Sequence, residues 1–129
     1  LEIMAQKFKA QPDQLIVPMI DARRDEVYTM VFDHKKKVVK DTWAEILNRE
    51  SFIDISENKT CIFFGDGSFK FKDISPKVKS VFIDEVCYPS AREMISISYK
   101  KFKNKIFESV AYFEPYYLKE FITTPPKKK

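Results

Sequence analysis

The sequence predicts an α/β fold in which three antiparallel strands are followed by strands joined through helices, giving one mixed sheet. Three observations indicate this order. Three short apolar segments lie close together before residue 41, and only short charged stretches separate them. A nearly continuous apolar run at Thr60 to Phe64 is typical of a strand that is buried on both faces. Two matches to the capping-box pattern of helix starts, at Thr42 and Ser90, lie on either side of that run.

A short helical segment opens the chain. Between Leu1 and Phe8, the apolar residues Ile3, Met4 and Phe8 recur at helical spacing and share one face. Pro12 disfavours helical geometry in the residue before it, so the helix ends ahead of this proline. Because no capping residue is present at its start, we expect the segment to be the end of a longer helix.

Three strands are predicted next, at Leu15 to Asp21, Glu26 to Asp33 and Lys37 to Lys40. Their short charged connections suit an antiparallel meander. The second strand has apolar side chains on both of its alternating faces, so both faces of the sheet are expected to be covered. These two faces carry Val27, Thr29 and Val31 on one side and Tyr28, Met30 and Phe32 on the other.

Helices and strands are expected to alternate after the third strand. The capping box Thr42-Trp43-Ala44-Glu45 predicts a helix that begins near Thr42, where hydroxyl and carboxylate would each bond a backbone amide. The buried strand at Thr60 to Phe64 comes next. A short helix at Phe69 to Ile74 and a further strand at Val81 to Val86 are predicted to follow.

The longest helix is predicted after Pro89, because Ser90-Ala91-Arg92-Glu93 is a second capping box. Its apolar residues at helical spacing are Ala91, Met94, Ile95, Phe102 and Ile106. The aromatic segment Phe113 to Leu118 is expected to be an extended piece docked on the core. Residues 123–129 are expected to form a flexible basic tail.

The composition indicates a folded, water-soluble chain. Of the 129 residues, 44% are hydrophobic and 15% are aromatic, which is more apolar material than a disordered chain carries. No apolar stretch approaches the roughly 20 residues of a membrane-spanning helix, and no secretory pattern is present. We therefore expect a cytoplasmic domain that does not bind membranes. Cys61 and Cys87 lack metal-site spacing and are expected to be buried thiols.

The formal net charge of +4 and the pI of about 9.0 make nucleic acid one candidate ligand. The charge is not focused, however, because Lys35-Lys36-Lys37 has the character of a turn and Lys127-Lys128-Lys129 closes the sequence. Without that last triplet the net charge falls from +4 to +1. Solvated turn and tail lysines are therefore favoured over a basic binding patch.

Two segments have the residue types of a binding site. Asp21 to Glu26 is rich in charged residues that can pair within a hairpin turn, although Arg23 and Arg24 can also hold a phosphate or a partner's carboxylate. Gly65-Asp66-Gly67 contains both glycines of the chain. Residues Gly65, Asp66 and Gly67 suit either a tight turn after a buried strand or a vestigial nucleotide-binding turn, although the P-loop pattern is absent.

Catalysis and metal binding are not expected from these residues. His34 is the only histidine, and it stands beside three lysines in a predicted turn. The carboxylates are scattered singly, whereas a two-metal active site needs several acids that converge on one place. Asp21 is a candidate first member of such a set, but no convincing set accompanies it. We predict no catalytic residue, no metal site and no cofactor.

The predicted order of elements is that of a ribonuclease H-like lobe, the unit duplicated in actin-like ATPases. Within it, Asp21 to Tyr28 resembles the signature Asp-Ala-Arg-Arg-x-Glu-Val-Tyr, which opens the second lobe of the TsaB (YeaZ) family. Looser similarities follow in the family's order at Phe64 to Gly67, at Pro89 to Ala91 and at Pro115 to Lys119, where Lys119 replaces the usual arginine. The resemblance covers nearly the whole chain, and the first motif is its specific part.

The resemblance implies an actin-like fold that has lost its catalysis. TsaB-like proteins bind TsaD, which transfers the threonylcarbamoyl group to adenosine beside the tRNA anticodon, and the small ATPase TsaE. The expected partners are therefore a TsaD-like transferase and a TsaE-like ATPase, with tRNA reached indirectly and a homodimer as a further candidate. The implied parts are residues 1–12 as the end of an inter-lobe helix, residues 13–122 as the C-terminal lobe and residues 123–129 as the tail. The signature residues, with partner or structural roles, are Asp21, Arg23, Arg24, Glu26 and Tyr28.

Two other functions remain open. An enzyme lobe of the same superfamily, kinase-like or glycoprotease-like, would bind nucleotide at Gly65 to Gly67. A basic RNA-binding module would use Arg23, Arg24 and the lysine runs, and its affinity for tRNA would fall steeply with salt.

Overall fold

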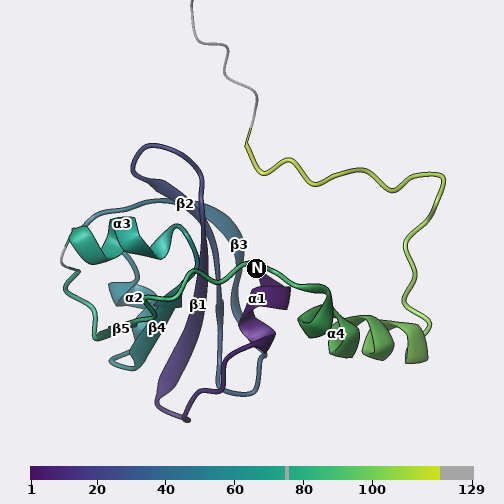
Figure 1. Ribbon diagram of the computed structural model, residues 1–129, viewed down its shortest axis with the longest axis horizontal. Helices are drawn as coiled ribbons and strands as arrows, with labels where there is room; N and C mark the ends of the chain where they lie inside the picture. The colour runs from purple at the N-terminus through teal and green to yellow at the C-terminus, as the bar shows by residue number, and fades with distance from the viewer. Residues whose placement is uncertain (75, 120–129) are drawn as a thin grey trace, which may run out of the picture.

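A computed structural model describes residues 1–74 and 76–119 as an α/β fold on one five-stranded mixed sheet (Figure 1). The strands are β1 (Gln14–Asp21), β2 (Glu26–Phe32), β3 (Val38–Ile46), β4 (Thr60–Phe64) and β5 (Ser80–Phe82). The helices are α1 (Glu2–Gln6), α2 (Ile53–Ser56), α3 (Ser68–Asp73) and α4 (Ala91–Lys103). The predicted strands at the positions of β1, β2 and β4 and the predicted helices at α1, α3 and α4 are confirmed within a few residues at their ends.

The strand order across the sheet is β3-β2-β1-β4-β5. β1, β2 and β3 form an antiparallel meander, β4 pairs with β1 in parallel, and β5 pairs with β4 in parallel. The predicted mixed sheet, with antiparallel strands first and parallel strands later, is therefore confirmed. Because β1 and β4 are parallel neighbours, their carboxyl ends lie at the same edge of the sheet.

Both faces of the sheet are covered, as the alternation in β2 predicted. On one face lies α3, together with Phe52 from the loop before α2, and here the rings of Phe52, Phe63 and Phe71 have centroids 5.0 to 5.3 Å apart. On the other face lies α1, whose Met4 and Ala5 are buried in a second apolar cluster (Figure 1). The β2 residues divide between the two clusters, with Val27 and Val31 in the first and Met30 and Phe32 in the second.

The helix predicted to begin near Thr42 is wrong, because this segment belongs to β3 and pairs with β2 as far as Ile46. The Glu45 carboxylate accepts hydrogen bonds from Trp43 Nε1 at 2.7 Å and from Ser51 Oγ at 2.7 Å, and so it caps no helix. As a strand, the segment bonds to β2 along its length and packs Trp43 on the apolar core. Tertiary pairing therefore overrides the local capping pattern.

Two details of the second half also differ from expectation. The strand predicted at Val81 to Val86 ends at Phe82, and only the Ile83 amide continues the pairing, donating to the Phe63 carbonyl at 3.0 Å. α4 begins after Ser90 as predicted, but the Ser90 hydroxyl bonds the Glu93 carboxylate instead of a backbone amide. The second capping box therefore marks the helix start without supplying the expected cap.

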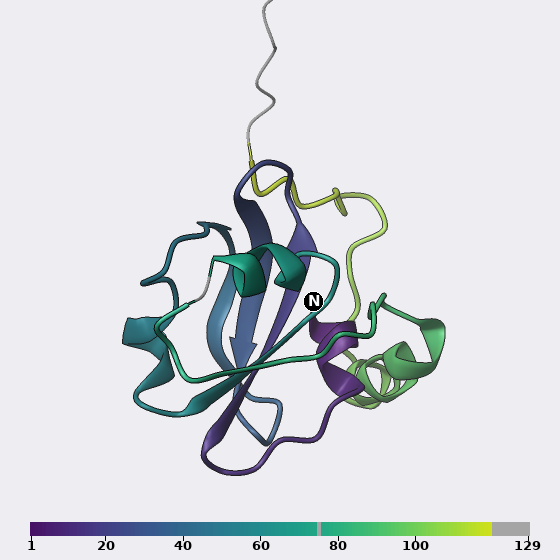
Figure 2. The same ribbon diagram turned by 60° about the vertical axis from the view of Figure 1, so that its left-hand side comes forward.

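α4 and the segment after it bury little apolar surface. No residue of α4 is buried, and the helix projects from the sheet beyond α1 (Figure 2). Phe113 to Leu118 is not docked on the core as predicted, since Tyr116 is 80% exposed and Tyr117 is 83% exposed. Among the described residues, neither of the two apolar clusters of the core includes a residue after Cys87. Residues 123–129, the predicted tail, lie outside the described part of the chain.

No helix in residues 1–74 and 76–119 has the length and apolar character needed to cross a membrane.

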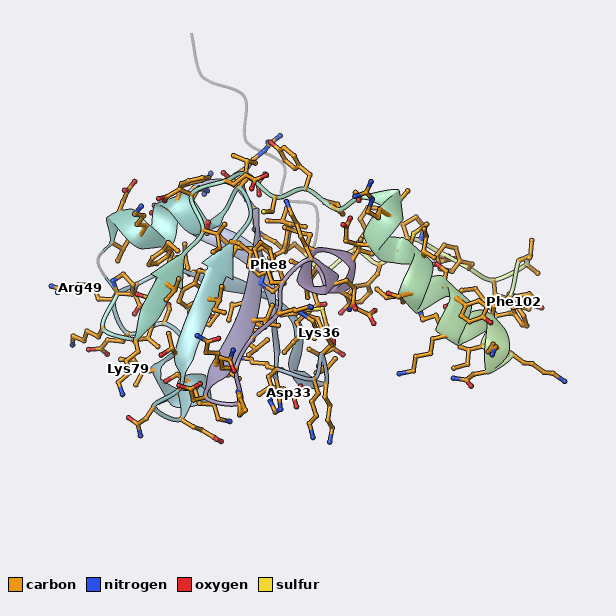
Figure 3. All side chains as sticks on the ribbon, turned by 60° about the horizontal axis from the view of Figure 1, so that its bottom comes forward. Phe8, Asp33, Lys36, Arg49, Lys79 and Phe102 are labelled. Atoms are coloured by element: carbon orange, nitrogen blue, oxygen red, sulfur yellow. The ribbon has the colours of Figure 1, made fainter. Side chains whose placement is uncertain are left out.

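Lys36, in the turn between β2 and β3, is not the solvated lysine that was predicted. Its Nζ donates to the carbonyl of Ala5 at 2.6 Å and to the carbonyl of Phe8, at the C-terminal end of α1 (Figure 3). The Ala5 carbonyl also accepts a hydrogen bond from the Phe8 amide at 3.4 Å, and the Phe8 carbonyl lies just beyond the helix, so the lysine adds a charged donor at the end of α1. Partial burial lowers the pKa of Lys36.

We expect Lys36→Met to lower the free energy of unfolding by about 1–3 kcal/mol, because the carbonyls of Ala5 and Phe8 each lose a charged donor. Lys35→Met is the matched control, since the side chain of Lys35 is exposed in the same turn, and its effect should stay within about 0.5 kcal/mol. Urea unfolding of both variants measures the difference. Equal stability of the two variants would contradict this role of Lys36.

Candidate functional site

The two segments predicted to carry function lie together at one edge of the sheet. Asp21 ends β1, and the turn Gly65-Asp66-Gly67 follows the parallel neighbour β4. The Asp21 amide donates to Asp66 Oδ1 at 3.0 Å, and the Gly67 amide donates to the Met19 carbonyl at 3.3 Å. The hairpin and the glycine turn, which the sequence presents as separate segments, therefore form a single site.

Both glycines are required by the close approach of this turn to β1 and β2. Gly65 has a φ of +99°, and a Cβ at this position would stand 2.2 Å from the Met19 carbonyl oxygen. A Cβ at Gly67 would stand 2.8 Å from Val27 Cγ1. Packing of the backbone against the neighbouring strands thus accounts for the glycines without a bound nucleotide.

The turn between β1 and β2 is braced from within and from α3. The Ala22 amide donates to the Glu26 carbonyl at 3.0 Å, and Asp21 Oδ1 accepts a hydrogen bond from the Arg23 amide at 2.6 Å. Lys70 Nζ, from α3, donates to Asp21 Oδ1 at 2.7 Å and to the Arg24 carbonyl at 2.5 Å. Sequence reasoning missed Lys70, because nothing in a short charged helix indicates which distant strand end it will reach.

The signature residues fall into two groups. Asp21 and Glu26 have partners within the chain, the latter through an ion pair with Lys119 Nζ. Tyr28 is half-buried in β2, opposite Ile20 of β1 and Ala44 of β3. The side chains of Arg23 and Arg24 are exposed, and neither guanidinium has a hydrogen bond or ion pair with a residue that the structure describes.

The hydrogen bond from Lys70, and after it the bond from the Arg23 amide, lowers the pKa of the Asp21 carboxyl. A carboxyl whose pKa is lower in the folded state contributes stability above its unfolded pKa, about 3.9, and loses it as the pH falls through the folded value. We therefore expect Asp21→Asn to lose less stability than the wild type as the pH falls below about 4. Urea midpoints measured at a series of pH values test this. Asp25→Asn, which removes a neighbouring carboxylate with no hydrogen bond in the described structure, is the control for the change of charge. An Asp21→Asn curve that coincides with the wild-type curve would contradict the role of Asp21.

In the part of the chain that the structure describes, no metal-binding group of side chains accompanies the hairpin. Within residues 1–74 and 76–119, no three His, Cys, Asp or Glu side chains form a group that could hold a metal ion. Cys61 and Cys87 are buried free thiols, as predicted, and burial raises the pKa of Cys61 to about 12. A hollow of about 330 Å³ lies at β3 and the following loop, but none of its lining residues belongs to the hairpin or the glycine turn. Those lining residues are Lys40, Glu45, Asn48, Glu50, Ser51, Phe52, Asp54 and Ile55.

Comparison with known proteins assigns no family, since no family model matches the chain and no curated protein matches it significantly. The functional argument therefore depends on the hairpin, the glycine turn and the sheet that joins them.

Proposed function

We propose that this chain is the C-terminal lobe of a TsaB-like protein, a non-catalytic cytoplasmic subunit of the complex that makes threonylcarbamoyladenosine on tRNA. The observation that carries the proposal is the hairpin from Asp21 to Tyr28, which matches the family's signature and forms a braced turn at the sheet edge. The proposed partners are a TsaD-like transferase and a TsaE-like ATPase, with tRNA reached through the complex.

The sheet supports this proposal. The ribonuclease H-like lobe that the resemblance implies begins with three antiparallel strands and continues with strands connected through helices. The meander of β1, β2 and β3, followed by parallel β4 and β5, has this arrangement. Between β3 and β4 the chain forms only the four-residue helix α2 (Ile53–Ser56), because the segment from Thr42 belongs to β3.

A scaffold role also agrees with what the carboxylates at the sheet edge do. Asp21 accepts hydrogen bonds from Lys70 Nζ and the Arg23 amide, and Asp66 accepts one from the Asp21 amide. Acids that hold neighbouring backbone and side-chain groups have fewer lone pairs left for a metal ion or a substrate. The geometry therefore favours a structural use of both residues.

Reconstitution tests the proposal. The full-length product of this reading frame is mixed with a TsaD-like transferase and a TsaE-like ATPase, and complex formation is followed by size-exclusion chromatography with light scattering. Nucleoside analysis by mass spectrometry measures threonylcarbamoyladenosine on added tRNA. We expect a defined complex and tRNA modification that depends on this protein. If the protein neither associates with the two partners at micromolar concentrations nor stimulates modification, the proposal is wrong.

The alternative of a nucleotide-binding enzyme lobe makes a separate prediction, ATP binding at Gly65 to Gly67. Calorimetry of the full-length protein with ATP and magnesium measures that binding directly. Asp66→Asn keeps an oxygen acceptor for the Asp21 amide, whereas Asp66→Ala removes it. Tight ATP binding with turnover that both variants abolish would favour the enzyme over the scaffold.

A further inference from the structure

Two adjacent arginines at the tip of the β1–β2 hairpin have unusual backbone conformations. Arg23 has a φ of 69° and Arg24 a φ of 50°, in the left-handed region that residues other than glycine rarely adopt. This conformation costs folding free energy, and neither guanidinium regains it by bonding a described residue of the chain. The positive charge of Arg23 lies near the Asp21 carboxylate and favours its ionised form, but no hydrogen bond in the described structure requires a guanidinium at either position.

The turn is held in this conformation through its backbone. Asp21 Oδ1 accepts a hydrogen bond from the Arg23 amide at 2.6 Å, and Lys70 Nζ donates to the Arg24 carbonyl at 2.5 Å. The Leu47 amide, just after β3, donates to the Asp25 carbonyl at 2.7 Å. A site on a fixed turn loses less conformational entropy on binding than one on a mobile loop. The two guanidinium groups are thus presented from a rigid base.

Exposed aromatic side chains come just before the lysine that reaches this hairpin. The ion pair of Lys119 with Glu26 brings the end of the described chain alongside the hairpin (Figure 2). Tyr117, only two residues earlier and hence within about 7 Å of chain length, is 83% exposed, and Tyr116 beside it is 80% exposed. Arginine and tyrosine are among the residue types most enriched where protein interfaces gain their affinity.

The balance of charge at the tip favours a protein partner over RNA. Its cations are Arg23, Arg24, Lys70 and Lys119, and its acids are Asp21, Asp25, Glu26 and Asp66. Nucleic-acid affinity depends on a net positive surface, which this balance does not supply. A guanidinium fork, in contrast, matches a single carboxylate through two parallel hydrogen bonds.

We infer that the hairpin tip is a docking surface for a protein segment that carries two carboxylates, which bond Arg23 and Arg24, and an apolar part that packs on Tyr117. The inference rests on the proposed function, because the segment is assigned to another subunit of the same complex. It divides the signature by role: Asp21 and Glu26 hold the turn, and the arginines bind the partner.

The experiment uses the full-length protein with two probes. The first is the pair of a TsaD-like transferase and a TsaE-like ATPase, with affinity measured by biolayer interferometry. The second is a hexaglutamate peptide, whose binding is followed through the backbone amide NMR signals of the tip at low salt. Arg23→Glu/Arg24→Glu is expected to weaken binding of the pair by about 10-fold or more and to abolish the peptide-induced shifts.

Two further variants separate the arginines from net charge and from folding. Lys100→Glu/Lys101→Glu makes the same change of charge on exposed α4 and should alter affinity by no more than about 2-fold. Arg23→Gly/Arg24→Gly retains the turn, because glycine adopts a positive φ readily, and should lose as much affinity as the glutamate variant without a lower melting temperature.

The outcomes distinguish this inference from the proposed function. If the pair binds both arginine variants as tightly as the wild type, the docking surface is wrong and the scaffold function stands. If the pair does not bind at all, but hexaglutamate shifts the tip amides only when the arginines are present, the surface stands and the proposed partners are wrong. A uridine 12-mer that binds more tightly than hexaglutamate, and that needs both arginines, would assign the surface to RNA instead.

Discussion

Gly65→Ala is expected to lower the free energy of unfolding by about 3–5 kcal/mol, which is a large part of the stability of a domain this size. Gly65 has a φ of +99°, a backbone conformation that is strained for any residue other than glycine. The added Cβ would also stand 2.2 Å from the Met19 carbonyl oxygen. Because β1 pairs with β2 on one side and β4 on the other, this carbonyl cannot move without breaking the centre of the sheet.

The second glycine of the chain supplies the matched control. Gly67 has an ordinary φ of −76°, and the nearest atom to its added Cβ is a side-chain methyl, Val27 Cγ1, at 2.8 Å. Gly67→Ala should therefore cost less, about 1–2 kcal/mol. Urea or thermal unfolding measures both variants. If Gly65→Ala is no more destabilising than Gly67→Ala, the conformation of the turn described here is wrong.

Phe63→Ala is the second change with a large expected effect, a loss of about 3–5 kcal/mol in the free energy of unfolding. Phe63 is fully buried on β4. Its ring centroid lies 5.2 Å from that of Phe52, 5.0 Å from that of Phe71 and 5.3 Å from that of Phe82. Replacing Phe63 by alanine removes the ring that the other three rings contact and leaves a cavity between the sheet and α3. The fold then loses both the free energy of burying this ring and the packing contacts around it.

Phe102→Ala on α4 is the control for Phe63→Ala. Its ring is 66% exposed and meets the ring of Phe107, itself 65% exposed, at 5.9 Å (Figure 3). The same chemical change should alter the free energy of unfolding by no more than about 0.5 kcal/mol. Differential scanning calorimetry compares the two variants directly. Comparable losses would mean that α4 belongs to the folding core, contrary to its exposure.

For the candidate site, the residues of the hairpin and of the glycine turn were predictable from composition and from the resemblance. Their proximity was not, because it depends on β1 and β4 becoming parallel neighbours. Lys70 and Lys119 were not predictable either, since each reaches the hairpin from a distant part of the chain. The sequence also does not show that the acids of the signature hold the turn through ion pairs while its two arginines are exposed.

Two predictions failed because each relied on a local sequence pattern, whereas contacts with distant parts of the chain decide the structure. The capping box at Thr42 is a local pattern, and β3 forms there because pairing with β2 and packing of Trp43 outweigh it. The aromatic segment Phe113 to Leu118 has the composition of a segment packed on the core, but most of its side chains are exposed. Apolar content alone therefore does not decide whether a segment packs on the core.

By itself, the sequence determined β1, β2 and β4, the positions of α3 and α4, and the covering of both sheet faces. Burial runs almost continuously along the three strands, so their apolar residues specify them locally, and the spacing of apolar residues does the same for the two helices. Only the tertiary structure decided that Lys36 caps α1, that Asp21 is held by Asp66 and Lys70, and that α4 leaves its apolar face exposed. The hydrogen bonds of Lys36 and Asp21 join residues far apart in the chain, and they form only when the order of strands across the sheet is set.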